Sequence, residues 1–263
     1  NDCVRVAAHG IIVFMDAASL CKDDCLRKLV SNFTDSRVGA VAGRIVFTQS
    51  RENLTTESQG IYWRYEQLIK TAESSIGSLI GVDGPLYAIR KSLYTVLDAD
   101  MMSDFVTPLL VIRDGHCVVY EPDAVTYEEA TTQAGDEFRT RKRIVTRGFT
   151  ALARYPELLD ITTRPFLAWQ IISHKVLRWL VGFFYAGMTV SSFLLMAECL
   201  YAVAFGGLAI LMALAYRGLK IQDHPRKYFA VPYYFMLVNL AAMKGTLDFL
   251  RGKRVISWKP VRD

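Results

Sequence analysis

Residues 11–16 read IIVFMD, a short apolar run that ends in an acid. An apolar run of this length predicts a buried strand, and Asp16 stands at its carboxyl end. Predicted strands and helices alternate after it; the strands are 38–47, 85–90, 117–120 and 124–128, and the helices are 22–34, 57–76 and 104–114. The alternation predicts an α/β domain with a mainly parallel sheet. Such sheets bind ligands where strands end, which is where Asp16 lies.

The second half of the chain is much more apolar than the first. The chain has 263 residues, of which 52% are hydrophobic, and its mean hydropathy is +0.20. Residues 179–197 and 199–216 carry no charge, and only Glu198 stands between them. Each run approaches the ~20 residues of a membrane span, so they predict a transmembrane hairpin. The alternative is a buried hairpin of a soluble domain, but too little other chain remains to bury both helices.

The basic residues lie at the predicted cytosolic ends of these spans. The net charge is +5, and Lys and Arg gather in 217–227 and 251–262, whereas the tip at Ala197-Glu198 has none. The positive-inside rule then places the tip away from the cytosol. Because the charges flank apolar spans, membrane lipids explain them better than nucleic acid. We expect a plasma membrane protein, of a bacterial inner membrane, with the α/β part of the chain facing the cytosol.

The five cysteines are odd in number and scattered, which indicates free thiols in a reducing compartment. Cys21 and Cys25 have the spacing of half a metal site. Because no second His or Cys pair lies near them in the sequence, packing in a helix is the better interpretation.

Residues 136–154 predict a basic amphipathic helix. Arg139, Arg143 and Arg147 recur every four residues and therefore share one face. Such a helix is typical of the membrane interface. The alternative is a solvated charged face on an ordinary surface helix.

These observations predict three parts of the chain. The first is the α/β part, 1–135; the second is a set of interface helices, 136–175; and the third is the membrane region, 176–263. Within the membrane region we predict spans at about 176–197 and 199–216. A third apolar segment, 228–247, is short for a span and flanked by basic residues, so we predict that it lies in the interface or re-enters, with Trp258 in the cytosol.

Four motifs occur in an order that is more specific than any one of them. They are IVFMDAAS at 12–19, GSLIGVDGPLYAIR at 77–90, SDF at 103–105 and RTRKRI at 139–144. Together they resemble the family 2 glycosyltransferases, and most closely the membrane-bound processive branch with the cellulose, poly-N-acetylglucosamine and hyaluronan synthases. They look like that family's Asp-x-Asp site, acceptor-side loop, base motif and Gln-x-x-Arg-Trp motif.

The resemblance implies a fold, a reaction and a role for each motif. It implies the C-terminal part of a GT-A-like domain that transfers a sugar, with inversion, from a UDP-sugar to a growing polysaccharide. Asp104 would be the catalytic base. Asp16 would hold Mg²⁺ or Mn²⁺ and, with Arg143, bind the donor diphosphate. Asp83 and Gly84 would bind the acceptor. From the residues alone, Asp104 is also a candidate helix N-cap and Asp83 a candidate turn residue.

The chain departs from the family pattern at several positions. The second acid of Asp-x-Asp is Ala18, and the Gln and Trp of Gln-x-x-Arg-Trp are Thr140 and Ile144. The family's first strands would precede residue 1, so we expect the chain to be part of a longer enzyme. Two alternatives stay open. One is a non-processive transferase with a lipid acceptor, or one that works with a partner subunit; the other is a non-catalytic membrane scaffold or pseudo-enzyme.

Overall fold

The chain folds into two compact units. The computed structural model describes residues 1–48, 54–131, 133–221 and 227–256. Unit 1 comprises 1–48, 62–130 and 151–169, and unit 2 comprises 49–61, 131–150 and 170–263.

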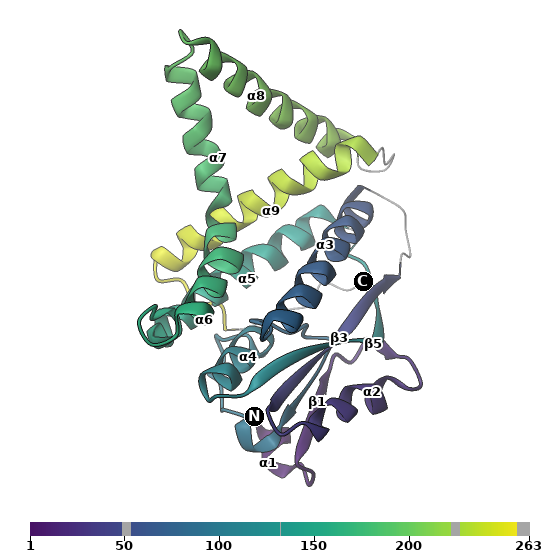
Figure 1. Ribbon diagram of the computed structural model, residues 1–263. Helices are drawn as coiled ribbons and strands as arrows, with labels where there is room; N and C mark the ends of the chain where they lie inside the picture. Colours follow the sequence, from purple (N-terminus) through teal and green to yellow (C-terminus); the bar gives the residue numbers. More distant parts are fainter. Residues whose placement is uncertain (49–53, 132, 222–226, 257–263) are drawn as a thin grey trace. The chain divides into compact units, whose positions relative to one another are not determined.

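Unit 1 is built on a five-stranded sheet of mixed direction (Figure 1). The strands are β1 (Ile11–Met15), β2 (Leu20–Cys21), β3 (Val38–Thr48), β4 (Leu86–Arg90) and β5 (Cys117–Glu129). Their order is β1-β4-β3-β5-β2, and only β3 and β5 run parallel. The prediction of a mainly parallel sheet is therefore wrong. The helix and loop after β3 return the chain to the end of the sheet from which β4 runs antiparallel to both neighbours.

Helices and short turns surround this sheet. They are α1 (Asp2–Val6), α2 (Cys25–Ser31), η1 (Asn32–Thr34), η2 (Lys91–Leu93), α4 (Ser103–Arg113), η3 (Pro156–Leu159) and α6 (Pro165–Gln170). Helix α3 (Leu54–Ile76) contributes its residues from Tyr62 onward. The two strands predicted at 117–120 and 124–128 are one strand, β5, with an irregularity between Tyr120 and Val125.

Alternate residues of the strands fill a core on each face of the sheet. Leu86 and Ala88 of β4 face the cluster that includes Leu29 of α2, whereas Tyr87 and Ile89 face the other cluster. This is the two-residue period of a strand covered on both sides. Gly39 of β3 lets α4 approach closely, because a Cβ there would lie 2.5 Å from Cγ1 of Val111. The same contact fixes the helix that carries Asp104.

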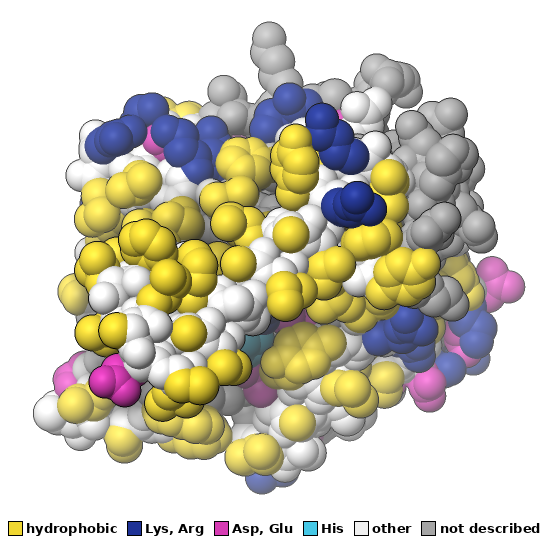
Figure 2. Space-filling model, turned by 90° about the horizontal axis from the view of Figure 1, so that it is seen from above, with side chains coloured by type: hydrophobic (Ala, Val, Ile, Leu, Met, Phe, Trp, Pro, Cys, Tyr) yellow, Lys and Arg dark blue, Asp and Glu magenta, His cyan; other side chains and the backbone are white. Residues whose placement is uncertain are grey.

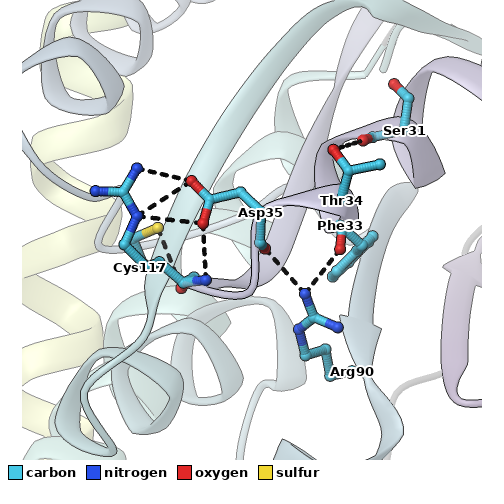
Figure 3. A network of polar contacts seen from close by, with 7 residues as sticks. Ser31, Phe33, Thr34, Asp35, Arg90 and Cys117 are labelled. Atoms are coloured by element: carbon cyan, nitrogen blue, oxygen red, sulfur yellow. Dashed lines mark hydrogen bonds and ion pairs between the residues drawn. The ribbon is translucent and has the colours of Figure 1, made fainter.

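Arg90 closes the end of the sheet at β4. Its guanidinium donates a hydrogen bond to the Val38 carbonyl oxygen at 2.8 Å. It also donates to the carbonyl oxygens of Phe33 and Asp35, both at 2.9 Å (Figure 3). These carbonyls belong to η1, to the turn after it and to the first residue of β3. Arg90 therefore stabilises the turn that precedes β3, a structural role for the last residue of the 77–90 motif.

Unit 2 is helical. Its helices are α5 (Ala134–Arg154), the π-helical η4 (Ile171–Val176), α7 (Leu177–Leu194), α8 (Cys199–Lys220) and α9 (Lys227–Leu250), together with the first residues of α3. Helices α7 and α8 form the predicted hairpin, with Glu198 directly before α8. The Tyr185 hydroxyl on α7 donates to the Leu208 carbonyl on α8 at 2.6 Å.

Two helices are long and apolar enough to cross a membrane: Pro165–Leu194 and Cys199–Lys220. Only 17% and 6% of their apolar windows are buried, and Figure 2 shows hydrophobic side chains gathered over a broad surface. Within the described ranges, α9 is not among these candidates. It contacts α7 where Gly182 faces Met243 and the Asn239 carbonyl. Its place in the interface stays a prediction, and Trp258 lies outside the described residues.

Candidate functional site

Asp16 lies where β1 ends, beside the start of β4. The register of the two strands pairs Met15 with Leu86, and the Asp16 amide donates to the Pro85 carbonyl at 3.4 Å. The Asp16 carbonyl in turn accepts from the Ser19 amide at 3.0 Å. The buried Ser19 hydroxyl donates to a carboxylate oxygen of Glu128 on β5 at 2.6 Å. The turn is thus fixed at both ends, and the Asp16 side chain faces solvent.

The loop 77–85 connects α3 with β4 and is tied down along its length. The Ser78 hydroxyl accepts from the Val118 amide at 2.7 Å, and the Leu79 amide donates to the Val118 carbonyl at 2.9 Å. Further along, the Val82 amide donates to the Asp104 carbonyl at 2.9 Å. The loop therefore contacts β5 at its start and the first turn of α4 near its end.

Asp104 occupies the first turn of α4 next to this loop. The N-cap is Met102, so Asp104 is not the N-cap residue. A carboxylate in the first turn is favoured by the helix dipole. A Cβ built on Gly84 would lie 3.6 Å from Oδ2 of Asp104. Because glycine has no side chain, space remains at this point beside the Asp104 carboxylate.

Tyr87 supports the same region from inside the sheet. Its ring stacks on Phe14 of β1 with centroids 4.7 Å apart, and it is 1% exposed. Burial raises the pKa of Tyr87, and the charge of nearby Asp104 raises it further. The phenol therefore stays protonated beside the carboxylate. Sequence analysis identified Tyr87 only as part of a motif, because strand alternation marks it as a core residue.

Asp83 is buried and paired. Lys70 of α3 donates a short hydrogen bond to Oδ1 of Asp83, and the two side chains are 7% and 9% exposed. The Lys70 ammonium lies 5.1 Å from the centre of the Trp63 ring. A buried ion pair is more than a turn residue requires. The sequence did not indicate Lys70 as a site residue, because a charged side chain on a helix is usually solvated.

The structure thus brings together four of the five predicted site residues within unit 1. We call the side chains of Asp16, Asp83 and Asp104 the acidic edge; Gly84 lies within it. Arg143, the fifth predicted residue, lies half-buried on α5 in unit 2.

A divalent cation would have one carboxylate of this chain available at the turn after β1, that of Asp16. No group of three or more His, Cys, Asp or Glu that could hold a metal occurs among the described residues. An exposed carboxylate fits Mg²⁺ or Mn²⁺ when substrate phosphates and water complete the coordination. Cys21 and Cys25 add no further ligand pair: Cys25 is fully buried, and the Cys21 thiol contacts the Met15 sulfur at 3.2 Å.

Comparison with known proteins gives the family. Residues 11–241 match the family described as glycosyl transferase family group 2. The match covers most of the chain, which therefore belongs to this family. A search of the curated proteins finds no match.

A solved structure shows the same fold. It is the mannosyltransferase PcManGT from Pyrobaculum calidifontis in complex with GDP-Man and Mn²⁺, which is similar with a TM-score of 0.67 at 18% identity. The alignment covers 96% of this chain and 66% of that chain. This chain thus spans just under two thirds of its structural neighbour, and the likeness concerns the fold.

Proposed function

We propose that this member of glycosyl transferase family group 2 is an inverting, metal-dependent glycosyltransferase. It moves a sugar from a nucleotide-sugar to a growing polysaccharide at the membrane. The observation that carries the proposal is the convergence of Asp16 and Asp104 on one loop. The Asp16 amide is bonded to the Pro85 carbonyl, and the Asp104 carbonyl to the Val82 amide.

Asp104 is proposed as the catalytic base. Its carboxylate accepts the proton of the acceptor hydroxyl while that oxygen attacks the anomeric carbon. Attack from the face opposite the departing diphosphate inverts the anomeric configuration. The absence of a side chain at Gly84 supports this role, since it leaves room for an acceptor beside Oδ2. Asp83 and Gly84 form the acceptor side of the site.

Asp16 and Arg143 are proposed to bind the donor diphosphate. Asp16 would hold Mg²⁺ or Mn²⁺, which neutralises charge on the diphosphate when bound. The structural neighbour was solved with GDP-Man and Mn²⁺, which supports a nucleotide-sugar and a divalent metal. We propose a UDP-sugar as the donor. The Arg143 guanidinium suits phosphate oxygens because its planar donors match them in pairs.

The acceptor is proposed to lie at a plasma membrane, with the acidic edge on the cytosolic side. The exposed apolar surfaces of α7 and α8 support membrane insertion. The same observation favours a second candidate: two candidate spans enclose little space, which suits a lipid acceptor and a non-processive reaction. A partner subunit would be another way to complete a path for a polymer.

The test uses the full-length natural protein in detergent or lipid nanodiscs. It is incubated with a panel of UDP-, GDP- and other nucleotide-sugars and with Mg²⁺, Mn²⁺ or a chelator, and nucleotide release is measured. We expect metal-dependent release with one donor and an inverted linkage in the product. Long products support the polysaccharide synthase, and a single sugar on lipid supports the second candidate. A lack of transfer with every donor and with membrane lipid extract would favour a non-catalytic scaffold.

A further inference from the structure

We propose that Lys70 is a positioning residue for the acidic edge. It acts through Asp83 and holds the loop 82–85 in place beside Asp104. The consequence for transfer rests on the proposed function, whereas the effect on the loop does not.

The Lys70–Asp83 ion pair is deeply buried. Both side chains are more than nine-tenths buried, and each is the ion-pair partner of the other. The aromatic face of Trp63 adds a favourable environment for the ammonium. Removing one partner of such a pair leaves an uncompensated buried charge, which proteins tolerate poorly. The contact therefore strongly restrains the position of Asp83.

Asp83 lies between two residues that contact Asp104. Its two neighbours are the residues that contact Asp104: the Val82 amide bonds to the Asp104 carbonyl, and Gly84 faces Oδ2. A shift of Asp83 would displace Val82 and Gly84 as well, since consecutive Cα atoms are held ~3.8 Å apart. Lys70, near the C-terminal end of α3, thereby controls the geometry at the proposed base.

The rest of the loop is held by contacts that do not involve Lys70. Ser78 and Leu79 are bonded to Val118 at the start of the loop. The end of the loop continues into β4, which is paired on both sides. The charge of Asp83 also acts on Tyr120 of β5. Burial raises the pKa of Tyr120 to about 12, and the negative charge of Asp83 adds to this increase. Among the described residues, Lys70 is the cation recorded as pairing with Asp83.

The test measures loop mobility by hydrogen–deuterium exchange of the full chain. We expect Lys70→Met to speed amide exchange in residues 79–86 by about tenfold or more, because it leaves Asp83 buried and unpaired. Arg64→Met is the matched control: it removes one cation from an exposed position of the same helix. It should leave exchange in the loop unchanged. Equal exchange in wild type and Lys70→Met would overturn the proposal.

A double variant separates loop positioning from general folding. Lys70→Met with Asp83→Leu removes both charges and keeps an apolar contact, so protection of residues 79–86 should return. If the single variant does not fold, the double variant decides. Failure of the double variant to fold would overturn the proposal, because the pair would then support the whole fold rather than the loop.

A kinetic measurement connects the loop with transfer. With the donor identified by the panel, Lys70→Met should lower kcat for transfer at least about tenfold while donor Kd changes little. Lys70→Arg keeps the charge and should recover part of kcat. An unchanged kcat in Lys70→Met would overturn the role in positioning. If wild type transfers no sugar at all, the proposed function fails, and the exchange experiment still decides the effect of Lys70 on the loop.

Discussion

The acidic edge of unit 1 and the basic helix α5 of unit 2 use charge differently. On α5, charged side chains have partners within unit 2: Arg141 pairs with Glu137, and Lys142 pairs with Asp248. Arg147 donates to the carbonyls of Val255 and Ile256 at 2.8 and 3.1 Å. At the acidic edge, by contrast, the Asp16 carboxylate faces solvent. Basic side chains of α5 can thus serve helix packing, whereas the exposed acid at the end of β1 is accessible to a ligand.

Glu137 shows how far α5 is committed to the fold. It is 2% exposed, and the Tyr234 hydroxyl of α9 donates to its Oε1 at 2.5 Å. Arg141 bonds to the same oxygen and to the Tyr234 hydroxyl. This buried network joins α5 to α9, so a basic residue of α5 need not contact lipid to be required. The predicted interface location of α5 stays a prediction.

We expect the largest effect on transfer from a substitution at the acidic edge that leaves α5 unchanged. Asp104→Asn in the full-length protein keeps the shape of the side chain and removes its basicity. We expect transfer to fall by about 10²–10⁴-fold, the usual contribution of a general base. Initial rates at saturating donor measure this. Retention of more than about a third of wild-type turnover would remove Asp104 from the role of base.

The next prediction compares three arginines of one helix. Arg143→Ala should lower kcat by about 10²–10³-fold if its guanidinium stabilises the departing diphosphate. Arg139→Ala should cost less, because Arg139 is exposed and paired with Asp136. Arg147→Ala should chiefly lower thermal stability, since it removes bonds to the carbonyls after α9. Equal, mild losses of kcat for all three would make α5 purely structural.

Asp16→Ala tests the metal at the acidic edge. We expect the apparent affinity for Mg²⁺ or Mn²⁺ to fall by at least about tenfold, because one protein ligand is lost. Donor binding should weaken with it. Ala18→Asp is the matched variant: it restores an acid two residues away and should leave activity intact or tighten metal binding. Unchanged metal titrations of activity in Asp16→Ala would make Asp16 a structural turn residue.

The smallest expected effect concerns the space in front of Asp104. Gly84→Ala places a Cβ 3.6 Å from Oδ2, an ordinary van der Waals contact, and should be nearly neutral. Gly84→Val adds two methyl groups there and should raise the acceptor KM several-fold, with little change in donor Kd. Similar kinetics for the two variants would show that the acceptor does not approach beside Gly84.

The sequence allowed most elements of unit 1 to be predicted, but not how they pair. Predicted strands at 11–15 and 38–47 correspond closely to β1 and β3. Hydrophobic runs mark strands whatever their direction, and direction depends on where the connection returns the chain. The loop 77–85 makes that return, and its path is set by bonds to Val118 and Asp104. Such long-range bonds leave no periodic signal.

The sequence predicts only those candidate site residues that belong to motifs. Asp16 and Asp104 both contact the loop that holds Gly84, and their roles in a site stay predictions. Lys70 could not be predicted from the sequence, because the apolar residues of α3 do not mark its buried face. Tyr65 and Leu68 are 58% and 72% exposed, whereas Lys70 is 5% exposed. A cationic side chain normally lies on the solvated face of a helix. Lys70 is buried because it pairs with the buried Asp83. Asp83 lies in the loop after α3, so the pairing leaves no pattern within the helix sequence.

Donor binding to Asp104→Asn distinguishes proton removal from donor binding. We assign Asp104 to the acceptor proton and Asp16 with its metal to the donor, so the two functions should separate. Titration of the full-length variant with the identified nucleotide-sugar and Mn²⁺ should give a Kd within about twofold of wild type, although transfer is lost. A parallel loss of donor binding and transfer would contradict the account, because Asp104 would then support the donor site or the fold instead of removing a proton.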